Sequence, residues 1–175
     1  MIPMKTLIDQ LAQYAAYHRD HRNIWTHFIG IPMIVLSVVT LLSRQVLAAP
    51  HVGAYVLYIT PALLVSAVVS VYYLRLDLRY GLVMAALLGL CCAAADTFAL
   101  GTSSMLWLGA GVGLFVVGWI IQFVGHYFEG RKPAFVDDLI GLLIGPLFIV
   151  AEAGFLLGLR RDVHDAVVAR AGAVR

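Results

Sequence analysis

Four long apolar runs, each about as long as a lipid bilayer is thick, constrain most strongly how this chain can fold. They cover residues 24–43, 52–74, 80–100 and 104–124. A helix needs roughly 20 mostly apolar residues to cross the hydrocarbon core, so each run predicts one transmembrane helix. In the fourth run, Gly109 and Gly113 form a GxxxG pair, which predicts close packing of that helix against a neighbour.

The composition agrees with an integral membrane protein. Hydrophobic residues make up 62% of the 175 residues and charged residues only 13%, whereas soluble domains average about 25% charged. The formal net charge of +2, without a long basic tract, argues against a nucleic-acid partner. No cleavable signal peptide is expected, because Met1–Asn23 is polar and rich in histidine. Cys91 and Cys92 are adjacent within an apolar run, which favours helix packing over a disulfide.

The chain is therefore expected to be all-α: an integral membrane helical bundle of about four transmembrane helices in one domain, residues 1–175. Residues 1–23 would hold an interfacial helix, 24–159 the membrane bundle and 160–175 a polar tail. Within residues 4–17, Leu7, Leu11 and Tyr14 share one helical stripe. That stripe indicates an amphipathic helix, which would either lie at the interface or cap the bundle.

The last apolar stretch, residues 134–159, is interrupted by Gly145 and Pro146 and carries Glu152. We expect a re-entrant or broken helix pair here, with the turn at Gly145–Pro146 buried in protein. The distribution of lysine and arginine favours a segment that returns to its starting side, with the N-terminus in the cytoplasm. That topology places on the cytoplasmic side most of the cations, namely Lys5, Arg19, Arg22, Arg75, Arg79, Arg131, Lys132, Arg160, Arg161 and Arg170.

Two polar regions at the ends of these runs carry most of the chemistry. Tyr17–Pro32 contains His18, His21 and His27, and Trp119–Ala134 contains Gln122, His126 and Glu129. The topology brings both regions to one membrane face. Neutral imidazole suits iron, zinc, copper or nickel, so the histidines predict a metal site, to which Glu129 and Glu152 could add carboxylates. For His18 and His27 to converge, we expect the chain to bend near Asn23; the alternative is that these are ordinary interfacial histidines.

The two regions also contain motifs that resemble a known family. They are YH-x4-N-x3-H-x2-G-x-P (Tyr17, His18, Asn23, His27, Gly30, Pro32) and W-x2-QF-x-GH…FE…PA (Trp119, Gln122, Phe123, Gly125, His126, Phe128, Glu129, Pro133, Ala134). A third pattern, D-x-L…P-x-F…E, follows with Asp137 or Asp138, Leu139, Pro146, Phe148 and Glu152. Together these motifs resemble the Mpo1-like family, formerly a domain of unknown function, which includes a fungal endoplasmic-reticulum 2-hydroxy fatty acid dioxygenase.

The resemblance implies an Fe(II)-dependent dioxygenase of fatty-acid α-oxidation, which converts a 2-hydroxy fatty acid to the fatty acid one carbon shorter using O2. His18, His27 and His126 fall on the family's motif histidines, and with Glu129 they form the expected catalytic and metal-binding set. His21 and Glu152 are further candidate metal ligands, although His21 falls where some members have no histidine. Glu129 follows His126 by three residues rather than the four of the fungal form, so the direction of its side chain is open.

The residues themselves are compatible with this chemistry. A 2-hydroxy acid can chelate iron through its hydroxyl and carboxylate, provided that the protein ligands leave positions open. Asn23 and Gln122 could orient ligands or substrate, or satisfy backbone groups at helix ends. Arg131 or Lys132 could attract the carboxylate, or act only as cytoplasmic topogenic charges. The expected partners are a 2-hydroxy fatty acid, O2 and membrane lipid, with no nucleic acid.

Three other classes of protein compete with this interpretation. Membrane hydroxylases and desaturases resemble one another in carrying HxxxH and HxxHH boxes, which this chain lacks. A small transporter usually shows internal repeats, and none is evident. The remaining alternative is a non-enzymatic or zinc-binding small membrane protein. Iron with O2-dependent turnover would distinguish the dioxygenase from it. The site is expected on the cytoplasmic side of the inner membrane in a bacterium, or of the endoplasmic reticulum in a eukaryote.

Overall fold

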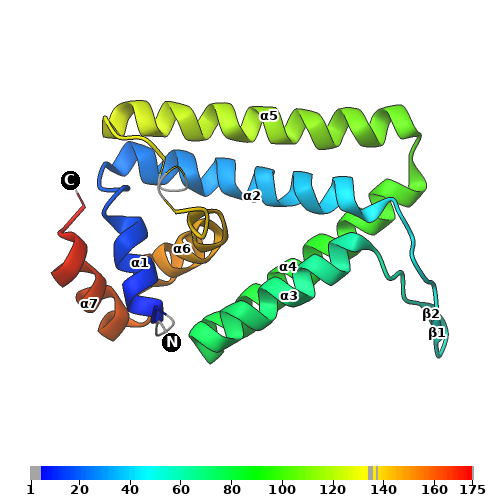
Figure 1. Ribbon diagram of the computed structural model, residues 1–175, viewed down its shortest axis with the longest axis horizontal. Coiled ribbons are helices and arrows are strands. Elements are labelled where there is room, and N and C mark those ends of the chain that lie inside the picture. The colour runs from blue at the N-terminus through cyan, green and yellow to red at the C-terminus, as the bar shows by residue number, and fades with distance from the viewer. Residues whose placement is uncertain (1–4, 134–135, 137, 175) are drawn as a thin grey trace. The chain divides into compact units, whose positions relative to one another are not determined.

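The computed structural model describes residues 5–133, 136 and 138–174, which are helical apart from loops and one short β-hairpin. The chain divides into two compact units, one formed by Met1–Pro32 with Gly118–Arg175 and the other by Met33–Val117. Helices α2 (His21–Ser43) and α5 (Ser104–Glu129) each contribute residues to both units (Figure 1). The all-α prediction is confirmed.

The first unit begins with α1 (Leu7–Ala15), the predicted amphipathic helix. Thr6 caps it: the Thr6 hydroxyl accepts a hydrogen bond from the Asp9 amide, and the Asp9 carboxylate accepts one from the Thr6 amide. The buried side of α1 carries Leu7, Leu11 and Tyr14. This side packs against α6 and α7, so α1 caps other helices of its own unit (Figure 1).

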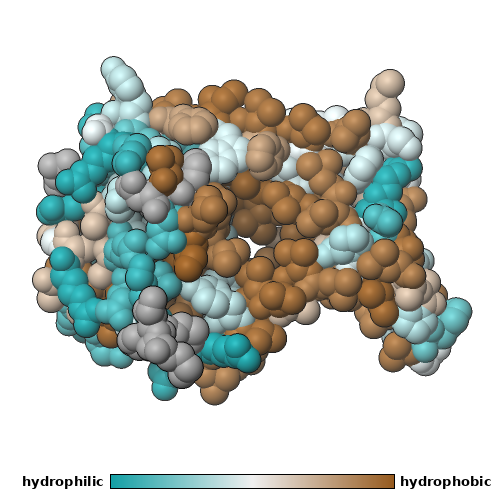
Figure 2. All heavy atoms as spheres, in the orientation of Figure 1, coloured by the Kyte–Doolittle hydropathy of each residue, from teal (hydrophilic) through white to brown (hydrophobic). Residues whose placement is uncertain are grey.

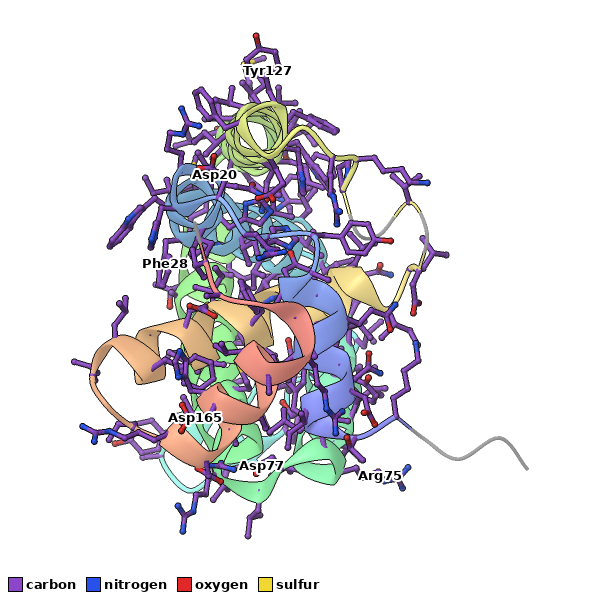
Figure 3. All side chains as sticks on the ribbon, turned by 90° about the vertical axis from the view of Figure 1, so that its left-hand side faces the viewer. Asp20, Phe28, Arg75, Asp77, Tyr127 and Asp165 are labelled. Atoms are coloured by element: carbon purple, nitrogen blue, oxygen red, sulfur yellow. The ribbon has the colours of Figure 1, made fainter. Side chains whose placement is uncertain are left out.

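The turn between α1 and α2 lies earlier than predicted. The cap of α1 is Ala16, and α2 begins at His21, where the Asp20 carboxylate accepts the amide hydrogen of Arg22. Figure 3 shows Asp20 at this end of α2. The expected bend near Asn23 is wrong, because Asn23 is already inside a regular helix. The chain instead changes direction at residues 17–20, so His18 lies in a connection and not on a helical face.

The broken helix pair is present, but its break was predicted at the wrong place. Helix α6 (Gly141–Leu156) continues through Gly145–Pro146. Gly145 serves close packing, since a Cβ there would lie 3.0 Å from Tyr14 Oη and 3.1 Å from Ile31 Cδ1. The chain breaks instead at Gly158 and Arg160, whose φ angles are 73° and 50°. It then turns by 115° into α7 (Arg161–Ala171), so most of the expected polar tail is helical.

The second unit contains the clearest departure from the predicted spans. Residues predicted to start the second span form a hairpin of β1 (His51–Val52) and β2 (Tyr55–Val56). Helix α3 (Pro61–Leu76) begins only at Pro61, behind a Thr60 cap. With 16 residues it is shorter than a full span. Helix α4 (Leu78–Gly101) follows and lies beside α3 (Figure 1).

The core of this unit joins α2, α3 and α4 through Val39, Ala62, Cys92 and Ala95. Both cysteines are free thiols, as expected. On α5 the close contact is at Gly111, whose carbonyl accepts from Ser37 Oγ at 2.7 Å and where a Cβ would lie 2.5 Å from Leu41 Cδ2. The predicted packing of Gly109 and Gly113 within the chain is wrong, because a Cβ at either would meet no atom within 4 Å.

Within the described residues, three helices, α2, α4 and α5, are long and apolar enough to cross a membrane, and the bent pair α6–α7 would make a fourth. Only 11% of the most apolar window of α5 is buried within the chain, so most of its apolar surface needs another apolar environment. Figure 2 shows hydrophobic residues over the visible faces of α3 and α4, whereas hydrophilic residues gather over α1 and α7. The fold is that of a helical membrane protein.

Candidate metal centre

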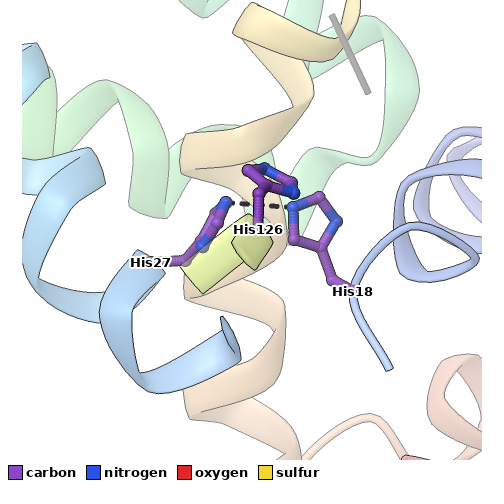
Figure 4. Close-up of side chains that lie close together, drawn as sticks. All are labelled: His18, His27 and His126. Carbon is purple, nitrogen blue, oxygen red and sulfur yellow. Dashed lines mark hydrogen bonds between the residues drawn. The ribbon is translucent and has the colours of Figure 1, made fainter. Parts of the chain in front are cut away.

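Three buried histidines converge in the first unit. His18 comes from the connection between α1 and α2, His27 from α2 and His126 from α5 (Figure 4). One ligand atom of each lies within 4.8 Å of the others, and none of the three residues is more than 6% exposed. The ring centroid of His126 lies 5.0 Å from those of both His18 and His27. Tyr127, the next residue on α5, points away from the helix into the surroundings (Figure 3).

Backbone carbonyls fix the tautomers of two of the rings. His18 Nδ1 lies 2.8 Å from the Tyr14 carbonyl, and His27 Nδ1 lies 2.8 Å from the Asn23 carbonyl. A carbonyl can only accept, so each Nδ1 must carry the proton and each Nε2 a lone pair. The two Nε2 atoms are nevertheless 3.0 Å apart. Two metal–nitrogen bonds of about 2.1 Å at a right angle would place their nitrogens about 3.0 Å apart.

His126 supplies a third candidate ligand. Its Nδ1 atom is buried and has no hydrogen-bond partner in the described part of the chain. A buried polar atom without a partner is costly, and a metal ion would satisfy it. Three imidazoles, two of them with the second nitrogen held by a backbone carbonyl, suit zinc, copper, nickel or iron. The residues present therefore fit a bound transition metal.

The environment of His18 keeps its ring in the metal-binding form. Burial lowers the pKa of His18 well below the usual 6.5, and the neighbouring charge of His27 lowers it further. The hydrogen bond to the Tyr14 carbonyl opposes these effects only in part. The ring is therefore neutral near pH 7, and neutral imidazole is the form that binds metal.

Aromatic residues hold the His18 ring in place. The Tyr14 ring stacks on it with centroids 4.2 Å apart and planes 6° from parallel. Phe148 of α6 packs against both, with centroid distances of 4.9 Å to Tyr14 and 5.8 Å to His18. Sequence reasoning placed Tyr14 only on an apolar stripe and missed this role. Its position four residues before His18, just ahead of the connection, was the available signal.

Glu129 organises the site instead of joining the three histidines. Its Oε2 atom accepts hydrogen bonds from the amides of Arg19 at 2.9 Å and Asp20 at 2.8 Å, and from Asn23 Nδ2 at 3.1 Å. The cluster of possible ligand atoms found among the described residues does not include it. Glu129 thus ties the end of α5 to the connection that carries His18. Asn23 links Glu129 to His27. Its side-chain amide donates to the Glu129 carboxylate, and its backbone carbonyl accepts from His27 Nδ1.

The other predicted residues lie around this centre. Gln122 is buried one turn before His126 and packs against Gly30 of α2, where a Cβ would lie 3.1 Å from Gln122 Cγ. Arg131 Nη1 donates to the Ala16 carbonyl at the end of α1, at 2.9 Å. Lys132 is exposed.

His21 and Glu152 lie outside the histidine cluster as the structure describes it. His21 is exposed in the first turn of α2. Glu152 is half-buried on α6 and lines a cavity of about 30 Å³ that is also lined by His18 and His164. Its carboxylate interacts electrostatically with His164 and His21. Glu152 thus shares a small cavity with His18 without belonging to the histidine cluster.

These features define a class: a helical membrane protein with a buried three-histidine site suited to a metal ion. Residues 4–156 match the family described as 2-hydroxy-palmitic acid dioxygenase Mpo1-like. The chain belongs to this Mpo1-like family, which confirms the resemblance of its motifs. It is 36% identical over 154 residues to the 2-hydroxy-palmitic acid dioxygenase MPO1 of Saccharomyces cerevisiae, an alignment that covers 87% of this chain and 82% of the relative. No solved structure matches the chain.

Proposed function

We propose that this protein is an Fe(II)-dependent dioxygenase that shortens a 2-hydroxy fatty acid by one carbon. Its family and its 36% identity to a yeast 2-hydroxy-palmitic acid dioxygenase support the reaction class. The observation that carries the proposal is the buried cluster of His18, His27 and His126, with two lone pairs facing each other at 3.0 Å.

The proposed reaction balances without a further reductant: R–CH(OH)–COOH + O2 gives R–COOH + CO2 + H2O. The bond between the first two carbons breaks. The substrate loses four electrons, which reduce O2 completely. Iron, when bound, would act as a Lewis acid and a redox centre. A site with three imidazole ligands leaves room for the hydroxyl and carboxylate of a chelating substrate.

We assign roles to the protein residues on this basis. His18, His27 and His126 hold the metal. Glu129 and Asn23 position His18 and His27, and Gln122 supports the packing of α5 beside α2. Glu152 and His21 lie outside the cluster and could complete the ligand set or accept the hydroxyl proton only after a shift of their side chains. Arg131 and Lys132, both exposed, would attract the anionic substrate from solvent.

The membrane accounts for the position of the site. The cluster lies at the beginning of α2 and near the end of α5, both candidate spans, so an acyl chain could remain among apolar side chains while its head reaches the metal. The excess of lysine and arginine at these helix ends favours placing the site on the cytoplasmic side. All 175 residues would form a single membrane domain.

The proposal is tested with detergent-purified protein that is loaded anaerobically with Fe(II). Adding 2-hydroxypalmitate should consume one O2 per molecule of substrate and yield pentadecanoate and CO2. Palmitate and 3-hydroxypalmitate, which lack the 2-hydroxyl, are the matched controls and should give no turnover. Tight zinc binding with no O2 consumption from the Fe(II) form would instead support the zinc-binding alternative.

A further inference from the structure

A second cavity lies wholly within the unit Met33–Val117. Its volume is about 510 Å³, within the range of roughly 300–1,000 Å³ typical of small-molecule sites. Val56, the last residue of the hairpin, and residues 57–58 form one wall, and Leu63 of α3 also lines the cavity. One face of α4 forms the opposite wall. None of the three site histidines lines this cavity.

The α4 face combines small residues with two polar ones. Gly89, Cys92 and Ala93 leave space, and a Cβ added at Gly89 would meet no atom within 4 Å. Cys92 Sγ lies 3.3 Å from Ser66 Oγ of α3, so the two helices are joined beside the cavity. Asp96 and Thr97 follow on the same face, one turn further along. The cavity is therefore lined mostly by apolar residues together with a few polar ones, as is usual for small-molecule sites.

Asp96 and Asp77, two carboxylates at α4, differ in their hydrogen bonding. The Asp96 Oδ1 atom is buried and has no hydrogen-bond partner within the described residues. By contrast, Asp77 accepts the amide of Tyr80 at the start of the same helix. Asp96 is the single acidic residue of α4, a candidate membrane span, where an ionisable residue is costly and usually functional. Asp96 lines the cavity, so a ligand head there would be placed to donate a hydrogen bond to its carboxylate.

Arg44 lies at this end of α4 and is already engaged. Arg44 donates to the carbonyls of Ala99 at 3.0 Å and Thr102 at 3.2 Å, and lies over the Trp107 ring. No hydrogen bond or ion pair between Arg44 and Asp96 is found among the described residues, and the Asp96 carboxylate lines the cavity. An anionic head, such as that of a fatty acid, would be repelled, whereas a protonated amine would be attracted and could donate a hydrogen bond.

We propose that this cavity binds the ammonium head of a long-chain amine from the membrane, with its alkyl chain along the small residues of α4. The site is separate in its residues from the histidine centre, and the proposal does not depend on the proposed dioxygenase function.

The test is direct binding of dodecylamine, dodecanol and dodecanoate to the full-length protein in a non-ionic detergent. Dodecylamine should bind about tenfold or more tightly than the other two, as a charge-assisted hydrogen bond implies. Asp96→Asn should abolish that preference. Equal affinity for all three amphiphiles in the native protein, or an unchanged preference in Asp96→Asn, would overturn the proposal.

A second pair of variants guards against a simple folding defect. Gly89→Leu extends a side chain into the cavity and should weaken binding of dodecylamine at least as much as Asp96→Asn. Gly113→Leu is the matched control, because Gly113 also has open space around it but lies on α5, outside the cavity lining. Undiminished dodecylamine binding by a folded Gly89→Leu would contradict the assignment of the cavity.

Discussion

His18 Nε2 and His27 Nε2 lie 3.0 Å apart, although both rings already donate their Nδ1 protons to backbone carbonyls. Two acceptors at this distance repel each other unless a cation lies between them. The surrounding structure holds them there through the stacked ring of Tyr14 and the carbonyl of Asn23. The fold therefore stores an unfavourable contact that metal binding would relieve.

Replacing one of these rings should separate metal binding from stability. We expect His27→Ala to abolish the Fe(II)-dependent rise in thermal stability, which for the native protein is about 2.7 kcal/mol at a metal concentration 100 times Kd. In chelator, the variant should lose less than the ~2–5 kcal/mol typical of a buried large-to-small change, because it also removes the repulsion. Unfolding of both proteins with and without Fe(II) measures this. A variant that Fe(II) still stabilises would contradict a role of His27 as a ligand.

Glu129 should support metal binding by positioning the residues around the histidines, without binding the metal itself. Glu129→Gln keeps the shape but removes the negative charge that two amides and Asn23 Nδ2 share. Hydrogen bonds to charged groups contribute about 1.5–3 kcal/mol, so we expect a loss of that order in stability. Metal affinity should fall about 10–100-fold, as for other groups that orient ligands. Complete loss of metal from a folded Glu129→Gln would indicate that Glu129 is itself a ligand.

The contact between α2 and α5 beside the site depends on Gly125. A Cβ there would collide with Thr26 Oγ1 and lie 2.5 Å from Asn23 Oδ1. We expect Gly125→Ala to cost about 1–3 kcal/mol by overpacking and to weaken metal binding, since His126 follows directly. Gly113→Ala on the same helix meets open space and should not reduce stability. Equal stability of the two variants, measured by thermal unfolding, would show that this contact is not tight.

The metal-free protein should lose stability as the pH falls. Burial lowers the pKa of His18 in the folded protein, whereas in the unfolded chain it is about 6.5. The unfolded state then binds more protons below about pH 6.5, so the contribution of His18 is fully present above that pH and is lost as the pH falls toward its folded pKa. Thermal unfolding in chelator from pH 7.5 to 5 should show this fall, and His18→Ala should flatten it. An unchanged slope in the variant would assign the effect to other groups.

The residues of the three-histidine cluster could be predicted from the sequence more accurately than the ends of the helices. Motif and topology arguments brought His18, His27 and His126 to one face, because their positions at the ends of apolar runs are visible in the order of residues. They could not show that Glu129 would turn toward backbone amides, since this depends on the path of residues 17–20. The spacing of His126 and Glu129 alone does not determine where the Glu129 side chain points.

Breaks in the apolar runs were harder to predict, because a glycine can either end a helix or allow close packing within it. Gly145 and Pro146 looked like a break, but Gly145 allows close packing against Tyr14 and the helix continues. The actual break uses Gly158 and Arg160 in left-handed conformations. Likewise, residues 52–56 are apolar enough to extend a span, yet they pair as a hairpin ahead of the Thr60–Pro61 helix start.

Metal content of the purified protein tests the central claim most directly. Native protein and His126→Ala would each be incubated with Fe(II) under anaerobic conditions, desalted, analysed for iron and then assayed for O2 consumption with 2-hydroxypalmitate. The account predicts near-stoichiometric iron and O2 uptake for the native protein, and loss of both in a His126→Ala variant that remains folded. Native protein that holds no iron, or a variant that keeps both iron and turnover, would contradict it.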